Sequence, residues 1–275
     1  PGRPHRVHCA GPGAVLPMET RTPPTPPRRG AYLLPNLFTT GGMMAGFYAI
    51  VAAIGGRYEE AAIAVFVAGV LDGIDGRVAR LTNTQSAFGV QYDSLADLVS
   101  FGLAPALVMY MWSLAALKGY SPLLGKVGWA AAFLYAACAA LRLARFNTQV
   151  GSVDKRWFIG LSSPAAAGLM MSYVWALADL GADGHRWAPV SVAVTVVAAL
   201  LMVSRIRYWS FKGGGSDDAH PDRVPFLTLV MMVGVFVLIA IEPPRVLLAI
   251  GVTYMVSGPL MALWRRRPQS PTPAA

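Results

Sequence analysis

Two neighbouring stretches decide the fold, and they read Asp72-Gly73-Ile74-Asp75-Gly76-Arg77-Val78-Ala79-Arg80 and, eight residues later, Gly89-Val90-Gln91-Tyr92-Asp93-Ser94-Leu95-Ala96-Asp97. With helical spacing, the carboxylates and small residues of the first stretch share one face. Gly89, Asp93 and Asp97 form a single i+4 row on the second. Two carboxylate-bearing helix faces can therefore meet across the turn that joins them.

Both stretches lie in strongly apolar surroundings. Of the 275 residues, 55% are apolar and only 13% are charged, which is typical of a membrane protein. A helix needs about 20 apolar residues to cross the hydrocarbon. Such runs predict eight transmembrane helices, at residues 38–56, 60–80, 91–117, 126–147, 162–181, 187–206, 224–241 and 245–264. We therefore expect an all-α integral membrane protein.

The distribution of basic residues predicts the orientation of these helices. With both termini in the cytoplasm, the outer segments hold Arg57, Lys118, Lys126, Arg186 and Arg245, and the inner segments hold the other 18 of the 23 Lys and Arg residues. Such an excess on one side is the positive-inside pattern. It predicts a multi-pass protein of the cell membrane whose carboxylate cluster faces the cytoplasm. The basic residues form no stripe with exposed aromatics, so nucleic acid is not expected as a partner.

The chain is expected to form one membrane domain with short irregular ends. Residues 1–30 are rich in Pro and Arg and lack periodicity, which predicts a disordered leader. Residues 1–17 precede Met18 and are interpreted as either vector-derived or an upstream extension. Residues 31–267 form the polytopic domain, and residues 268–275 a disordered tail.

The four aspartates predict a metal site. An Asp at the centre of a membrane helix costs about 2.5–3.5 kcal/mol on insertion scales, so a cluster needs compensation. Asp72, Asp75, Asp93 and Asp97 offer only oxygen ligands, which favours Mg²⁺ or Mn²⁺ over zinc. Gly76 and Ala79 lack bulk on the same face, and Arg80 can neutralise a phosphate oxygen. The pattern indicates a diphosphate site, although small residues also serve helix packing.

The spacing Asp-x2-Asp-Gly-x2-Ala-Arg-x8-Gly-x3-Asp-x3-Asp resembles the signature of the CDP-alcohol phosphatidyltransferase family, and every fixed position is filled. The resemblance implies a six-helix catalytic core, here followed by two further C-terminal helices. It also implies a homodimer and two metal ions between the aspartates and the CDP diphosphate.

The same resemblance implies a role for each motif residue. Asp72, Asp75 and Asp93 would be metal ligands, and Asp97 would be both a ligand and the proton acceptor. Contacts to the CDP-lipid would come from Pro35, Asn36, Thr39, Gly76, Ala79, Arg80, Ser86 and Gly89. An N-cap at Asn36 is an equally good interpretation of that residue.

The acceptor alcohol must be predicted from other segments. Residues 141–147 and 156–167 are similar to the corresponding stretches of family members that use L-serine, except that Ser162 stands where those members usually carry Pro. The expected reaction transfers the phosphatidyl group of CDP-diacylglycerol to the hydroxyl of L-serine and releases CMP. Arg142, Arg145 and Asn147 are the candidate acceptor contacts, because a guanidinium matches a carboxylate. Both arginines could equally anchor a helix end at the interface.

Two other functions fit parts of the sequence. A member of the same family could use glycerol 3-phosphate or inositol phosphate, and would then need cationic residues for a second phosphate. A cation transporter would use intramembrane aspartates to carry ions. Against transport, the carboxylates cluster toward the predicted cytoplasmic end of two adjoining helices, and no matching cluster occurs in the second half of the chain.

Overall fold

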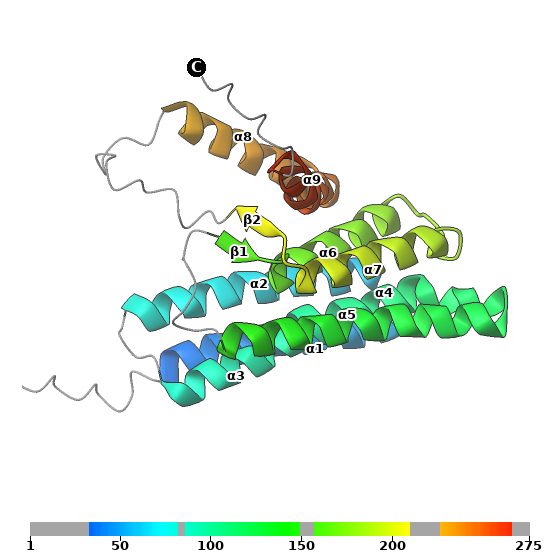
Figure 1. Cartoon of the computed structure of the whole chain (residues 1–275), viewed down its shortest axis with the longest axis horizontal. Helices are drawn as coiled ribbons and strands as arrows, with labels where there is room; N and C mark the ends of the chain where they lie inside the picture. The colour runs from blue at the N-terminus through cyan, green and yellow to red at the C-terminus, as the bar shows by residue number, and fades with distance from the viewer. Residues whose placement is uncertain (1–32, 82–85, 149–156, 210–225, 266–275) are drawn as a thin grey trace, which may run out of the picture.

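The computed structural model describes residues 33–81, 86–148, 157–209 and 226–265 (Figure 1). The predicted leader and tail lie outside these residues. The described helices are α1 (Leu33–Ile54), α2 (Tyr58–Leu81), α3 (Ala87–Asp97), η1 (Leu98–Leu103), α4 (Ala104–Trp112), η2 (Leu114–Gly119), α5 (Pro122–Thr148), α6 (Ser163–Asp179), α7 (Ala188–Val203), α8 (Phe226–Ile241) and α9 (Pro243–Arg265). Two short strands, β1 (Trp157–Ile159) and β2 (Arg207–Trp209), complete the described part.

The predicted all-α membrane fold is confirmed. Because α3, η1 and α4 follow one another without a break, each of the eight predicted spans corresponds to one helical rod. Within the described ranges, residues 35–54, 88–112, 122–148 and 243–262 are long and apolar enough to cross a membrane, and Ala188–Val203 and Thr228–Ile241 are shorter apolar helices. Most large apolar side chains of α8 are exposed, as expected for a helix in a lipid environment.

Several helices begin earlier than predicted, and in two of them a local feature explains the start. The first starts at Leu33 rather than at residue 38, with Pro35 in its first turn, where a backbone N–H has no helical partner and Pro is tolerated. Asn36 therefore lies inside the helix, and its interpretation as an N-cap is wrong. The third rod starts at Ala87 because Ser86 is its N-cap and accepts a 2.9 Å hydrogen bond from the Gly89 N–H.

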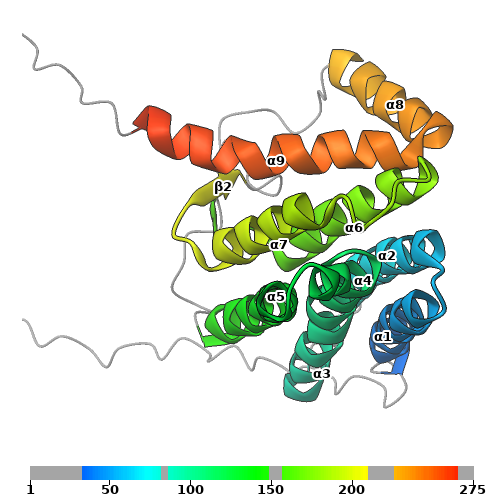
Figure 2. The same ribbon diagram turned by 90° about the vertical axis from the view of Figure 1, so that its right-hand side faces the viewer.

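Small residues bring α1 and α2 close together. Ala49 and Ala52 of α1 and Ala61 and Ala62 of α2 are fully buried, which is the packing expected where helices associate in a membrane. Larger buried side chains lie between the central helices, among them Phe101, Met109, Leu114, Tyr135, Met170, Met171, Val174 and Met202. The core thus lies between α2, α4, α5, α6 and α7 (Figure 2).

A π-helical turn interrupts the third rod directly after Asp97. In η1 the Ala104 N–H donates to the Val99 carbonyl, five residues earlier, which widens the helix by one residue. Within the turn Ser100 and Phe101 are buried, and Ser100 donates a 3.1 Å hydrogen bond to the carbonyl of Gly42 on α1. The turn therefore fixes α1 against the carboxylate-bearing rod.

The structure adds a feature that the sequence did not predict. Strands β1 and β2 form an antiparallel ribbon in which Phe158 pairs with Tyr208, and the ribbon lies beside α9 (Figure 1). Figure 1 views α9 nearly along its axis, whereas α1 and α5 lie across the view. The C-terminal helix therefore crosses the bundle instead of running parallel to its first helices.

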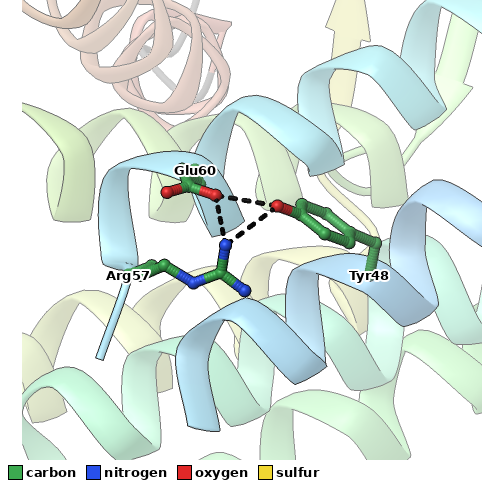
Figure 3. A network of polar contacts seen from close by, with 3 residues as sticks. All are labelled: Tyr48, Arg57 and Glu60. Carbon is green, nitrogen blue, oxygen red and sulfur yellow. Dashed lines mark hydrogen bonds and ion pairs between the residues drawn. The ribbon is translucent and has the colours of Figure 1, made fainter. Parts of the chain in front are cut away.

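A polar network ties α1 to α2 at the end of the bundle away from the carboxylates (Figure 3). Arg57 Nη1 donates to Glu60 Oε2 at 2.8 Å and to the Tyr48 hydroxyl at 3.2 Å, and Tyr48 in turn donates to Glu60 at 2.7 Å. All three side chains are exposed, so the network contributes little free energy. The alanine contacts, rather than this network, hold the two helices together.

Replacing Gly46 by Ala is expected to destabilise the bundle. A Cβ at Gly46 would lie 2.6 Å from Ser100 Oγ and 2.7 Å from Ser100 Cα, so α1 and η1 would have to separate. We expect a loss of about 1–3 kcal/mol, measured as a lower melting temperature in detergent. Gly234→Ala in α8 is the matched control, because nothing lies within 4 Å of its added Cβ. Equal melting temperatures for the two variants would contradict the close contact.

Candidate metal centre and active site

Three carboxylates from two helices converge at one point. Asp72 and Asp75 come from α2 and Asp93 from α3, and one oxygen of each lies within 4.8 Å of the others. Asp75 is buried, with 5% of its surface exposed, and the other two are half-buried. The i+3 spacing of the first pair and the antiparallel course of α2 and α3 produce this arrangement. The sequence therefore predicted the meeting of these three side chains.

Asp97 lies on the wall of the same small cavity. Its lining consists of Thr39, Gly42, Met43, Ala68, Asp72, Asp75, Asp93, Ala96, Asp97, Ser100 and Phe101. The cavity volume is about 10 Å³, which is room for a single water-sized sphere. All four predicted aspartates thus share one cavity, although the compact group of three oxygens does not include Asp97.

The electrostatics of this cavity favour a cation. Carboxylates a few ångströms apart repel one another strongly where the surroundings exclude water. Protonation or a bound cation relieves this repulsion. The donors are carboxylate oxygens, which suit the hard ions Mg²⁺ and Mn²⁺. The residues present therefore fit a divalent metal ion.

A threonine of α1 holds one of these carboxylates. Thr39 Oγ1 lies 2.8 Å from Asp75 Oδ2 and 3.1 Å from the Pro35 carbonyl oxygen, and donates to these acceptors. Thr39 is itself buried, with 6% of its surface exposed. The expected contact of Thr39 with the CDP-lipid stays a prediction, and the structure adds a contact with a carboxylate of the cluster.

The other residues predicted to contact the CDP-lipid surround the N-terminus of α3 or lie on the last turns of α2. A Cβ built at Gly89 would lie 3.5 Å from Asn36 Oδ1, so the start of α1 lies beside the start of α3. Gly76 is exposed, and nothing lies within 4 Å of a Cβ built there. Arg80 is exposed, and its Nε donates to the Gly76 carbonyl at 2.8 Å. Open space beside Gly76 can therefore accept a ligand.

The predicted acceptor contacts fall into separate environments. Arg142 donates from Nη1 to Ser163 Oγ at 2.8 Å, and its buried Nε has no hydrogen-bond partner among the described residues. The guanidinium also interacts electrostatically with Asp97. Asn147 Nδ2 donates to Ser94 Oγ at 3.0 Å, next to Asp93. Arg145 is half-buried in the last turn of α5.

Sequence reasoning missed two residues of this region. Ser163 accepts the Arg142 hydrogen bond, and Ser94 accepts the Asn147 hydrogen bond. A signal existed for Ser94, since it sits inside the motif beside Asp93. The neighbouring Ser162 was noted as a departure from the usual Pro, and it caps α6 by accepting from the Ala165 N–H at 3.3 Å. The departure therefore leaves the start of α6 intact.

This helical membrane fold, with its shared carboxylate cavity, matches a known family. A family model described as CDP-alcohol phosphatidyltransferase matches residues 32–202, and the chain belongs to this family. The matched segment contains all four aspartates and ends within α7.

Curated relatives carry a more specific name. The chain is 40% identical over 181 residues to the CDP-diacylglycerol–serine O-phosphatidyltransferase of Helicobacter pylori, covering 66% of this chain and 73% of the relative. It is 40% identical over 168 residues to the protein of that name from Mycobacterium tuberculosis, covering 58% and 54%. For the Bacillus subtilis protein of that name the identity is 30% over 191 residues, covering 69% and 97%.

Asp93→Asn is expected to weaken Mn²⁺ binding by at least about tenfold. The substitution removes one of the three clustered oxygens and its charge, and even indirect changes at metal sites cost about 10–100-fold in affinity. Binding is measured as the loss of the free Mn²⁺ signal in electron paramagnetic resonance on purified protein. Asp179→Asn is the control, because Asp179 is exposed and pairs with Arg245 at 3.4 Å. Unchanged affinity in Asp93→Asn would contradict a metal site at this cluster.

Proposed function

We propose that this chain is a CDP-diacylglycerol–serine O-phosphatidyltransferase. It would transfer the phosphatidyl group of CDP-diacylglycerol to the hydroxyl of L-serine and release CMP. The observation that carries the proposal is the cavity shared by Asp72, Asp75, Asp93 and Asp97 in a chain of the CDP-alcohol phosphatidyltransferase family. The names of several relatives support serine as the acceptor.

The carboxylates would hold the metal. Asp72, Asp75 and Asp93, whose oxygens lie within 4.8 Å of one another, are the proposed ligands, with Asp97 alongside. Two divalent ions, Mg²⁺ or Mn²⁺, would neutralise the charge of the CDP diphosphate and of the departing CMP. Gly76 and Ala79 leave space for the diphosphate, and Arg80, whose Nε donates to the Gly76 carbonyl at 2.8 Å, is the proposed cationic contact.

Asp97 is proposed to act as the proton acceptor. Its carboxylate would take the proton of the serine hydroxyl, and the hydroxyl oxygen would form a bond to the phosphorus of the phosphatidyl group. The bond between that phosphorus and the bridging oxygen of the diphosphate would break, and CMP would leave with that oxygen. No covalent intermediate with the protein is needed. Asp97 lies one helical turn beyond Asp93, so the base stays on the wall of the cavity that the proposed metal ligands line.

Arg142 is the proposed anchor for the serine carboxylate. Its buried Nε lacks a partner among the described residues, and leaving such a donor unpaired is costly, so a bound acceptor oxygen would relieve this cost. The interaction of Arg142 with Asp97 supports a position beside the base. Arg145 and Asn147 are retained as candidate contacts, although the hydrogen bond from Asn147 to Ser94 also supports a role in positioning α3.

The alternative functions have less support. A phosphorylated acceptor would require several cations, and the names of the relatives favour serine over glycerol 3-phosphate or inositol phosphate. Cation transport is not favoured, because the carboxylates cluster at one end of α2 and α3 in a segment that matches a transferase family.

We further propose that the enzyme is a homodimer in the cell membrane, with both termini and the active site on the cytoplasmic side. The basic residues of the sequence support this orientation, because Arg77, Arg80, Arg142 and Arg145 lie at the same ends of α2 and α5 as the carboxylates. The dimer is supported only by resemblance to the family.

Purified protein in detergent is expected to release CMP from CDP-diacylglycerol when Mn²⁺ or Mg²⁺ and L-serine are present. A chelator should abolish the release, because the carboxylates would then repel the diphosphate. The release is measured by chromatography with L-serine, glycerol 3-phosphate and inositol phosphate as separate acceptors. Release with a phosphorylated acceptor alone would keep the family and overturn serine as the acceptor.

Asp97→Asn is expected to lower serine-dependent CMP release by at least about 100-fold, because a general base typically contributes 10²–10⁴-fold. Binding of CDP-diacylglycerol, measured as thermal protection in the presence of Mn²⁺, should be largely retained. Asp179→Asn is again the matched control and should be as active as the unchanged protein. Substantial turnover in Asp97→Asn would remove Asp97 as the base.

A further inference from the structure

The two threonines at positions 39 and 40 connect α1 to both helices that carry the carboxylates. Thr39 Oγ1 lies 2.8 Å from Asp75 Oδ2 on α2. Thr40 Oγ1 lies 2.9 Å from the hydroxyl of Tyr92 on α3, and Tyr92 directly precedes Asp93. Consecutive residues of a helix point about 100° apart, so neighbouring threonines can reach two different helices.

The two contacts differ in their surroundings. Thr39 and Asp75 are both buried, with 6% and 5% of their surfaces exposed, so bulk water does not compete for their hydrogen bond. The contact between Thr40 and Tyr92 is exposed. A hydrogen bond to a buried carboxylate is among the stronger ones in proteins. The bond from Thr39 to Asp75 is therefore the stronger of the two contacts.

The rest of α1 leaves Thr39 little freedom. Three residues after it, the Gly42 carbonyl accepts the 3.1 Å hydrogen bond from Ser100, and at Gly46 the helix backbone approaches Ser100 so closely that a Cβ would lie 2.6 Å from Ser100 Oγ. The depth and rotation of α1 are thus fixed against the rod that carries Asp93 and Asp97. Because Thr39 is fixed with α1, it can hold the carboxylate of Asp75 in one orientation.

We propose that Thr39 is a positioning residue for the metal centre, which holds the Asp75 carboxylate in the orientation in which it meets Asp72 and Asp93. The hydrogen bond engages Oδ2, and because an ionised carboxylate has about four lone-pair sites, it can accept from Thr39 and still bind a metal ion. Groups that hold a metal ligand in this way raise metal affinity by restricting the ligand to its binding orientation. This inference rests on the metal site of the proposed function.

The inference makes α1 part of the metal centre. Its start, at Pro35 and Asn36, lies beside the N-terminus of α3, where the CDP-lipid contacts are expected. Thr39 follows one turn later. The same helix therefore contributes both to the expected CDP-lipid contacts and to the orientation of Asp75.

Thr39→Val tests the positioning role, because it keeps the shape of the side chain and removes its donor. We expect Mn²⁺ affinity, measured by electron paramagnetic resonance without CDP-lipid or acceptor, to fall by about 10-fold or more. Thr39→Ser restores the hydroxyl and should bind Mn²⁺ within about threefold of the unchanged protein, on the same scale of effects. Thr39→Ala is measured in parallel, since it removes the donor with a smaller side chain if Val is poorly accommodated.

Thr253→Val is the matched control. Thr253 also donates to the carbonyl four residues earlier, Ala249, at 2.7 Å, as Thr39 does to Pro35, but it is exposed on α9. Its substitution should leave Mn²⁺ affinity unchanged. A Thr39→Val and Thr39→Ala affinity equal to that of the control would overturn the positioning role.

The test of Thr39 and the test of the proposed reaction can fail independently of each other. If Asp93→Asn loses Mn²⁺ while both Thr39 variants bind it normally, the metal site stands and the role of Thr39 is overturned. If the Thr39 variants lose Mn²⁺ but CMP release requires a phosphorylated acceptor, the positioning role stands and only serine as the acceptor is wrong.

Discussion

The mutual repulsion of clustered carboxylates is the constraint on which this structure depends. Asp72, Asp75 and Asp93 bring their oxygens within 4.8 Å of one another in an apolar domain, where water screens them less than at an open surface. Such a cluster persists only if neighbouring helices hold the carboxylates in place and a cation offsets their charge. The packing of α1, α2 and η1 around a cavity of about 10 Å³ meets the first requirement, and the oxygen ligands are suited to the second.

Much of the site follows from periodicity alone. The i+3 and i+4 spacing of the aspartates, on two helices joined by a short turn, was enough to predict that their faces meet. Thr39 could not be assigned in the same way, because its contact with Asp75 spans 36 residues of sequence and depends on how deeply α1 sits against α2. Likewise, the partner of Arg142 is Ser163 on another helix, and no local pattern specifies that pair. Long-range side-chain contacts are set by packing, which sequence spacing does not encode.

The fold, like the site, could be predicted where a local sequence pattern determines it and could not where long-range contacts do. Apolar runs predicted every helical rod, because each rod is long and rich in apolar residues. The ends shifted where capping and proline decided them, at Ser86 and Pro35. The ribbon of β1 and β2 was not predicted, since three-residue strands are too short to show an alternating pattern. The crossing of α9 over the bundle also depends on contacts, such as the Tyr208 ring beside Gly258 and the 3.2 Å hydrogen bond from the Tyr208 hydroxyl to the Met255 carbonyl.

The π-helical turn at Leu98–Leu103 has a consequence for how this protein tolerates insertions and deletions. The turn holds one residue more than an α-helix would, so every side chain after it is rotated by about 100° relative to an uninterrupted helix. Deleting a single residue there would restore regular winding and still leave a continuous apolar rod. It would, however, rotate the side chains of α4 by about 100° relative to Asp93 and Asp97. The number of residues in this short segment is therefore constrained in addition to their identity.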